Sequence, residues 1–319
     1  MTRWDWSWEE RAKSSASEEP PPVVGPPNSP RLDRGKFRRR RAAAVLIALV
    51  LLVVAIATIA ANSSHHHPKP PTKVARYKKP TRQMAHMPIT PAEEQAAINH
   101  VLSYTPVVVH GGAKGHELAL TFDDGPGPYT QHLVDVLNSL KVKATFFAIG
   151  EEERYFSAGT IAELRSGDVV GDHTETHPMM ASLSAHDQYE ELFEQIARIE
   201  LLGGPRPRLF RPPYGSFDAT TFKQLRKLRL LMVLWSTDTS DYTKPGVAAI
   251  VRSALSGVHP GSIILMHDAG GDRSETIAAL PAIIRGLRKR GLHPVTIPRL
   301  LLDDPPPRGE PLPTSLAGD

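Results

Sequence analysis

Two adjacent carboxylates form the first pair of residues whose types and spacing are suited to catalysis. Asp123 and Asp124 follow an apolar run and stand directly before Gly125. Neighbouring side chains in a regular strand point to opposite faces, so the two could not share a task there. A turn at Gly125 would let both face one cavity. A simple turn cap is the alternative for an isolated DDG segment.

A pair of histidines complements these carboxylates. His173 and His177 have the i, i+4 spacing that places two imidazoles on one face of a helical turn. Two imidazoles and one carboxylate form a three-ligand site with open positions, which is suited to zinc, cobalt or another divalent ion. Such an ion lowers the pKa of bound water or polarises a carbonyl, and the second carboxylate can accept the proton of the water.

Three more polar segments offer supporting groups. In RPPYG the two prolines have no N–H, so the first free amide after Arg211 belongs to Tyr214 and can stabilise an oxyanion. Asp241 and His267 can form a carboxylate-held imidazolium whose raised pKa suits a proton donor. Taken singly, a rigid turn and a structural histidine are the alternatives.

Repeated βα units must position these groups. Short apolar runs alternate with helical patterns from residue 117 onward, which indicates a parallel sheet or barrel. The predicted strands are 118–122, 144–149, 169–171, 208–210, 231–235, 263–266 and 294–297, and the predicted helices are 129–140, 185–203, 218–228 and 276–291. Every polar segment follows a strand's carboxyl end, which is the rim where βα folds build active sites.

Composition separates this folded stretch from both ends of the chain. Six of the 30 prolines lie before position 42, seven lie between 62 and 106, and five lie after 303. Residues 42–61 are uncharged and almost wholly apolar, which predicts a single transmembrane helix. A cleaved signal peptide is the alternative. The predicted domains are a disordered tail at 1–41, the helix at 42–61, a Pro- and Lys-rich linker at 62–114, one folded domain at 115–303 and a Pro-rich tail at 304–319.

Charge on either side of the apolar segment predicts its orientation. Seven Lys and Arg residues lie in 27–41 and three lie in 62–76, which places the N-terminus in the cytoplasm and the folded domain outside. The linker would reach on the order of 40 Å as a coil. The net charge of +4 comes largely from this block, so nucleic-acid binding is not expected, and the lack of cysteine excludes thiol catalysis and Cys-ligated zinc. No role is assigned to His65, His66 and His67, and a docking motif at Trp4, Trp6 and Trp8 or a plain disordered tail both remain open.

Taken in order, the polar segments resemble the five motifs of the NodB-homology polysaccharide deacetylases, carbohydrate esterase family 4. The matching segments are TFDDG at 121–125, HTETH at 173–177, RPPYG at 211–215, TDTSDY at 237–242 and ILMHD at 264–268. The resemblance spans about 115–303 and implies a distorted (β/α) barrel that removes acetyl groups from a polysaccharide.

The resemblance also implies a role for each residue. Asp124, His173 and His177 would bind the metal, and Asp123 would act as base, held by Arg211. Tyr214 would supply the oxyanion amide, and Asp241 would orient His267 as acid. Leu265 would line the acetyl pocket. Tyr242 stands where the family commonly has Trp, which affects the shape of the hydrophobic wall and thus substrate preference.

An outward-facing, tethered member of this family is expected to act on N-acetylglucosamine residues of peptidoglycan, with no obligate protein partner evident. Chitin-like, poly-N-acetylglucosamine and O-acetylated xylan substrates are alternatives. An inactive wall-binding homologue is a second class of function, and a non-haem iron oxygenase is a third. The presence of every ligand, acid and base type speaks against the second, and the βα alternation speaks against the third.

Overall fold

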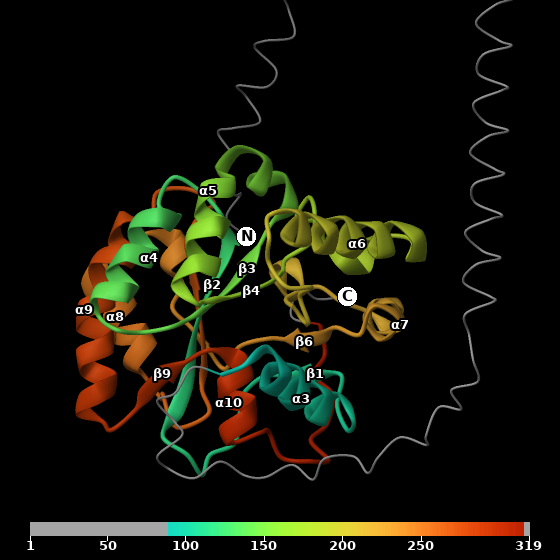
Figure 1. Cartoon of the computed structure of the whole chain (residues 1–319). Coiled ribbons are helices and arrows are strands. Elements are labelled where there is room, and N and C mark those ends of the chain that lie inside the picture. Colours follow the sequence, from blue (N-terminus) through green and yellow to red (C-terminus); the bar gives the residue numbers. More distant parts are fainter. Residues whose placement is uncertain (1–88, 316–319) are drawn as a thin grey trace, which may run out of the picture. The chain divides into compact units, whose positions relative to one another are not determined.

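The computed structural model describes residues 89–315, which form a parallel sheet covered by helices (Figure 1). The strands are β1 (Val107–Val108), β2 (Glu117–Gly125), β3 (Thr145–Ala148), β4 (Val169–Asp172), β5 (Leu209–Phe210), β6 (Leu231–Val233), β7 (Thr237–Asp238), β8 (Ile263–His267) and β9 (His293–Val295). The helices are α3 (Pro91–Leu102), α4 (Thr130–Ser139), α5 (Gly150–Ser166), α6 (Ala185–Leu201), α7 (Ala219–Leu228), α8 (Val247–Leu255), α9 (Ser274–Lys289) and α10 (Ile297–Asp303). All seven predicted strands and all four predicted helices are present, with ends within three residues of the prediction.

The sheet is a curled half-barrel with open edges. Its strand order is β1-β6-β5-β4-β3-β2-β8-β7, with β9 added beside β2, and the pairings among these described strands are all parallel. The prediction of βα units around a parallel sheet is confirmed. The predicted barrel is incomplete, because β1 and β7 stand at opposite ends of the strand order.

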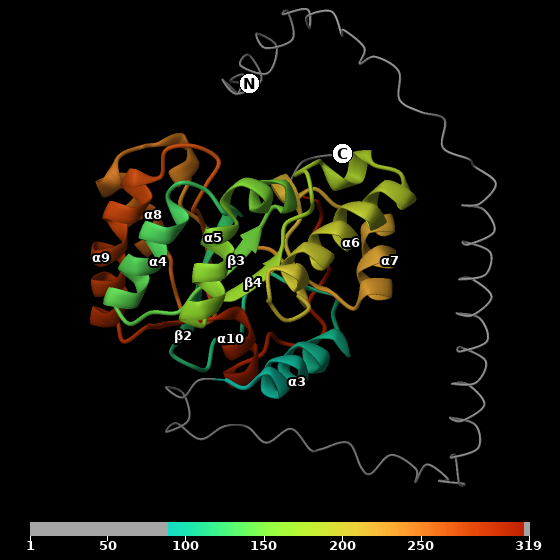
Figure 2. The ribbon, with the colours of Figure 1, turned by 45° about the horizontal axis from the view of Figure 1, so that its top comes forward.

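Alternation along β2 separates two apolar cores. Leu118, Leu120 and Phe122 point outward into the core beneath α4, α8 and α9, helices that lie side by side in Figure 2. Ala119 belongs to the inner core with Phe147 of β3 and Ile263 of β8. The next inward positions after Ala119 are Thr121 and Asp123, so the strand's own period carries one of the predicted catalytic residues to the concave side.

The folded domain begins well before residue 115, which corrects the predicted linker of 62–114. Helix α3 opens with a capping box between Thr90 and Glu93 and buries Ala97, Ile98 and Val101 in the inner core. It lies beside α10 at the end of the sheet where the strands begin (Figure 1). The two helices close the inner core at that end, and β1 then pairs with β6. Proline content alone therefore misplaced this boundary.

The chain after α10 also packs on the domain, contrary to the predicted Pro-rich tail at 304–319. The carboxylate of Asp304 accepts hydrogen bonds from the amides of Lys114 and Gly115 at 2.6 and 2.9 Å. The hydroxyl of Tyr104 donates to the carbonyl of Pro306 at 2.9 Å, and Ser315 donates to the carbonyl of Gly215 at 3.3 Å. The described part of this segment, up to residue 315, is thus fixed by local hydrogen bonds despite its prolines.

Among residues 89–315 no helix has the length and apolar character that a bilayer crossing requires. The predicted spanning segment 42–61, the tail 1–41 and most of the predicted linker lie outside the described residues.

Candidate active site

A bulge at the end of β2 turns both carboxylates toward the same place. The register of β2 against β3 shifts between Asp123 and Gly125, and the intervening Asp124 has a φ of 71°. A bulge inserts one extra residue and interrupts the alternation of side chains. The predicted turn at Gly125 is therefore replaced by a bulge within the strand, with the same result. The left-handed conformation of a non-glycine residue costs on the order of 1 kcal/mol or more and is characteristic of functional sites.

The segment from His173 to His177 is a loop after β4, as Gly171 before it and Pro178 after it predict, and the two imidazoles are not paired by a helical turn. It follows β4 without helical structure, and Thr174 and His177 have φ angles of 71° and 60°. The two imidazoles still meet, with ring centroids 4.9 Å apart. The two residues with left-handed φ angles make the loop tight enough to bring both imidazoles together, as one turn of helix would.

Asp124, His173 and His177 form the cluster expected of a metal site. Their ligand atoms all lie within 4.8 Å of one another. The Nε2 atoms of His173 and His177 are 3.5 and 3.2 Å from Oδ1 of Asp124. Burial raises the pKa of Asp124, but the charge of His177 and hydrogen bonds from both histidines outweigh it and hold the pKa well below its usual range. The carboxylate is therefore ionised, as a metal ligand must be.

The other nitrogen of each imidazole has a partner that orients the ring. Nδ1 of His173 donates to the carbonyl of Arg211 at 2.7 Å, because a carbonyl can only accept, so Nε2 is the ring nitrogen that faces Asp124. Nδ1 of His177 lies 3.2 Å from the hydroxyl of Tyr214. Such outer contacts fix the tautomer and direction of metal-binding histidines. The donor set fits a divalent ion such as zinc.

Arg211 holds the second carboxylate in the interior of the sheet. Its Nη1 donates to Oδ1 of Asp123 at 2.8 Å and to the hydroxyl of Thr121 at 2.7 Å. Its remaining nitrogens donate to the carbonyls of Val233 and Leu234, and the guanidinium lies 4.3 Å from the ring centre of Phe147. Arg211 is fully buried, and burial lowers its pKa against the opposing effect of Asp123. The expectation that Arg211 contacts Asp123 is met.

Asp241 and His267 meet across two strand ends. Nδ1 of His267 donates to Oδ1 of Asp241 at 2.7 Å, and the backbone amide of His267 donates to Oδ2 at 2.9 Å. Burial lowers the pKa of His267, but the charge and hydrogen bond of Asp241 outweigh it and raise the pKa to about 9. The imidazole is then a cation at neutral pH, with Nε2–H free to donate a proton.

Register places the remaining predicted residues near this pair. Thr121 pairs with Leu265 and Asp123 pairs with His267 between β2 and β8, so all four side chains lie on the concave side. Leu265 is buried, with 4% of its surface exposed, and its role in an acetyl pocket stays a prediction. The ring of Tyr242 stands edge-on to His267 with centroids 5.3 Å apart.

Tyr214 lies at the site in an unexpected way. It has a φ of 58° within the short 3-10 turn Pro213–Gly215, and its ring packs edge-on against His177 with centroids 4.7 Å apart. The sequence suggested a role for its amide alone. The side chain in addition contacts a predicted metal ligand, which no spacing rule indicated.

Several supporting residues escaped the sequence interpretation. Thr276 of α9 donates to Oδ2 of Asp241 at 2.7 Å, and Thr239 donates to Oδ1 at 3.2 Å. Behind the bulge, Asp268 accepts from Thr130 and leaves no room for a side chain at Gly125. The sequence does not predict the contacts of Thr239 and Thr276 with Asp241, because no spacing rule relates them to it. Asp268 belongs to the ILMHD segment, which marks it as a residue near the site.

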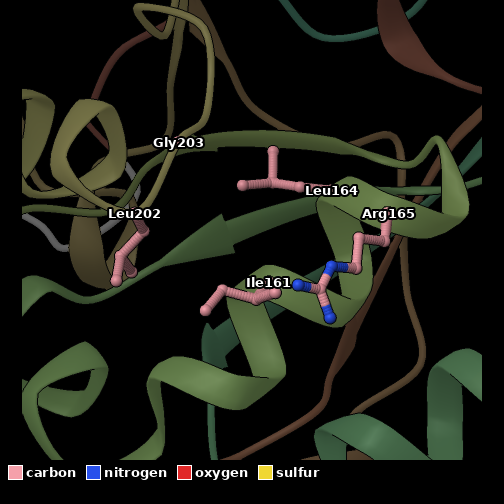
Figure 3. A pocket seen from close by; sticks show the side chains of 5 residues that line it. All are labelled: Ile161, Leu164, Arg165, Leu202 and Gly203. Atoms are coloured by element: carbon pink, nitrogen blue, oxygen red, sulfur yellow. The ribbon is translucent and has the colours of Figure 1, made fainter.

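A surface depression lies away from this site. It has a volume of about 310 Å³ and is lined by Ile161, Leu164 and Arg165 of α5 with Leu202 and Gly203 after α6 (Figure 3). These residues are near the carboxyl ends of their helices, away from the strand ends that carry the cluster. The site described above is thus identified by its side-chain chemistry.

Comparisons with known proteins agree with this geometry. The family model for polysaccharide deacetylases matches residues 110–233. A peptidoglycan-N-acetylglucosamine deacetylase of Bacillus cereus is 37% identical over 194 residues, which cover 58% of this chain and 87% of the relative. The crystal structure of the Bc1960 peptidoglycan N-acetylglucosamine deacetylase is similar with a TM-score of 0.60 at 32% identity, covering 63% of this chain and 94% of the other.

A third similarity qualifies the first two. BA3943, a CE4 family pseudoenzyme from Bacillus anthracis, matches with a TM-score of 0.59 at 28% identity, covering 62% of this chain and 70% of its own. The same fold is therefore compatible with loss of activity. Activity therefore depends on the side chains at the strand ends.

Proposed function

This chain belongs to the polysaccharide deacetylase family, and from that premise we propose that it is a metal-dependent hydrolase of N-acetyl groups on N-acetylglucosamine residues. One observation carries the proposal. The three-ligand cluster of Asp124, His173 and His177 is flanked by a buried carboxylate with a fixed partner and by an imidazolium with a raised pKa. Metal ligands, a base and an acid are together the groups that metal-assisted hydrolysis of an amide requires.

Each side chain then has a separate task in amide hydrolysis. A divalent ion held by the cluster would lower the pKa of a bound water and polarise the acetyl carbonyl. Oδ2 of Asp123 lies 3.8 Å from Nε2 of His173, while Oδ1 is occupied by Arg211, so Oδ2 is the oxygen placed to accept the proton of the attacking water. The amide of Tyr214 would donate to the developing oxyanion.

His267 supplies the second proton. As the water oxygen bonds to the carbonyl carbon, the C–N bond must break, and an amide anion is too basic to leave. Nε2–H of His267 donates to the leaving nitrogen, and Asp241 stabilises the imidazolium until that transfer. Acetate and a free sugar amine are the products.

We propose peptidoglycan as the substrate and the outer side of the membrane as the location. The support is the predicted anchor at 42–61, with its excess of Lys and Arg on the N-terminal side, and the names of the two deacetylases to which the chain is similar. Because the folded domain begins near residue 89, the tether shortens to 62–88, and a coil of that length reaches about 30 Å. The nearest wall layer falls within that distance.

Acetate release from several polymers tests the activity and its substrate together. The purified full chain should release acetate from N-acetylated peptidoglycan faster than from chitin oligosaccharides, poly-N-acetylglucosamine or acetylated xylan, and Asp123→Asn should abolish release from all of them. Faster release from another polymer would contradict peptidoglycan as the substrate and would identify that polymer in its place. Absence of release from every polymer would favour an inactive wall-binding role.

Protease accessibility tests the location. Protease added to intact spheroplasts should digest the folded domain and spare the first forty residues. Protection of the domain would contradict an outward orientation, and a soluble mature form would indicate signal cleavage.

A further inference from the structure

A buried glutamate lies in the middle of the loop that carries the two histidines. Glu175 is 2% exposed and is flanked by two arginines from different helices. Nη2 of Arg154 in α5 donates to Oε1 at 2.6 Å. Arg198 in α6 donates from Nη2 to Oε1 at 2.6 Å and from Nε to Oε2 at 3.2 Å. Three charge-assisted hydrogen bonds therefore tie the loop to both helices.

The backbone of the same loop is tied to the same two helices. The amides of Gly150 and Glu151, at the start of α5, donate to the carbonyls of Thr174 and Glu175 at 3.0 and 2.8 Å. On the other side, the carboxylate of Glu191 in α6 accepts from the amide and the hydroxyl of Thr176.

These ties surround a strained stretch of chain. Thr174 and His177 both adopt left-handed φ angles, which non-glycine residues keep only where the surroundings enforce them. The spacing of His173 and His177 therefore depends on contacts that pull the middle of the loop into the body of the fold. Glu175 supplies the buried carboxylate among these contacts.

The surroundings of Glu175 are shaped to receive it. A Cβ atom at Gly150 would overlap Oε2 of Glu175 and would lie 2.7 Å from Oε1 of Gln195. Gly150 does not have a positive φ, so its backbone conformation is open to any residue. Glycine is needed at this position for space, and the space is filled by the glutamate.

We propose that Glu175 is a positioning residue for the metal ligands, acting through Arg154 and Arg198 to hold His173 and His177 at the separation that one ion requires. The inference rests on the proposed function, because it presumes that Asp124, His173 and His177 bind a metal. Glu175 itself donates no ligand atom to the cluster of three.

Metal titration of the chelator-treated full chain tests this role. Glu175→Gln keeps the size of the side chain and removes its charge, and zinc affinity measured by calorimetry should fall about 10- to 100-fold, the range for residues that orient ligands. The matched control is Glu200→Gln, the same substitution at a glutamate whose carboxylate forms an exposed ion pair with Arg206, 3.4 Å apart. Its zinc affinity should equal that of the unaltered chain.

Two further variants test the same role if Glu175→Gln does not fold. Gly150→Ala displaces the carboxylate without removing it, and Arg154→Met removes one of its three donors from a half-exposed side chain. Each should weaken zinc binding while circular dichroism of the metal-free protein stays unchanged. A purely structural role would instead lower the melting temperature and leave the zinc affinity of the folded protein unaltered.

The outcomes separate the two proposals. Failure of the unaltered chain to bind zinc would contradict the proposed function. Zinc binding by the unaltered chain with equal affinity in every folded variant of Glu175, Gly150 and Arg154 would overturn the positioning role alone.

Discussion

Nη1 of Arg211 lies 2.8 Å from Oδ1 of Asp123, and both side chains are withdrawn from solvent. The pair links β5 to β2 through the inside of the sheet. The backbone carbonyl of Arg211 meanwhile receives Nδ1–H of His173. Arg211, the residue directly after β5, therefore contacts the proposed base through its side chain and a proposed metal ligand through its backbone.

Removal of the Arg211 side chain alone should destabilise the fold far more than removal of the charges of both Arg211 and Asp123. Arg211→Met leaves Asp123 buried without its counter-charge, and loss of one partner of a buried pair costs about 3–5 kcal/mol. The double variant Arg211→Met with Asp123→Asn should recover a large part of that loss. Urea unfolding of both variants measures the free energy of unfolding. Equal decreases in the single and double variants would mean that an unpaired Asp123 does not destabilise the fold.

Substitutions of the two adjacent carboxylates should affect metal binding and turnover differently. Asp124→Asn should reduce metal affinity together with activity, since Asp124 faces both imidazoles. Asp123→Asn should retain the metal and lose turnover, because only the proton acceptor is missing. Metal content and acetate release, measured on the same preparations, separate the cases. An empty site in Asp123→Asn would reverse the assignment of base and ligand.

The imidazolium predicts a dependence on the leaving group. General acid catalysis typically contributes a factor of about 10² to 10⁴. His267→Ala should lose that factor on N-acetylglucosamine polymers and much less on an acetylated phenol, whose phenolate leaves without a proton. Equal losses on both substrates would assign His267 to support of the fold or the metal.

Asp241 should set the pH at which that acid is lost. The pKa of His267 is raised from 6.5 to about 9, so its proton is retained as pH rises through neutrality and is lost near pH 9. Asp241→Asn removes the charge responsible and should move the basic limb of the amide pH profile to lower pH. The stabilising effect of the pair has the same sign. It is complete below pH 6.5 and disappears as pH rises through about 9.

Sequence patterns accounted for the parts of the fold that follow regular periods. The strands were found because continuous apolar runs reflect burial on both faces. Helix α5 was missed because its buried face consists of Gly150, Glu153, Gly159, Thr160 and Glu163, which give no apolar period. Gly150 at the start of this face lies against Glu175 of the histidine loop, and Gly159 lies against Pro126 and Thr130, so small and polar residues take the place of an apolar stripe.

The residue types in the motifs predict which side chains form the site, but they do not predict the backbone geometry that brings these side chains together. The motifs named the residues that meet, yet the bulge at Asp124 and the left-handed loop of His173 and His177 depend on contacts with elements distant in sequence. The i, i+4 spacing is compatible with a helical turn, and Gly171 and Pro178 indicate a loop, but neither pattern specifies the backbone angles of that loop. The tertiary ties to α5 and α6 permit a tighter loop instead.

The polar face of α5 predicts a pH-dependent stability. Glu153 is 2% exposed, and burial raises its pKa from 4.5 to about 7 against the effects of Thr160 and Arg198. A raised carboxyl pKa contributes stability that is complete below about pH 4.5 and is lost as pH rises through 7, on the order of 2–3 kcal/mol.

The unaltered chain should therefore lose more stability between pH 5 and pH 8 than Glu153→Gln does. Urea unfolding at both pH values measures the difference, with the exposed Glu200→Gln as control. Parallel changes in all three proteins would mean that Glu153 is ionised in the native state at pH 5.

Restoration of activity by metal tests the central claim most directly. The full chain, treated with a chelator and dialysed, should release no acetate from N-acetylated peptidoglycan, and one equivalent of zinc or cobalt should restore release. The variants His173→Ala and His177→Ala should stay inactive at the same metal concentration. Undiminished acetate release by the chelator-treated protein, or by either histidine variant, would contradict a metal-dependent deacetylase built on Asp124, His173 and His177.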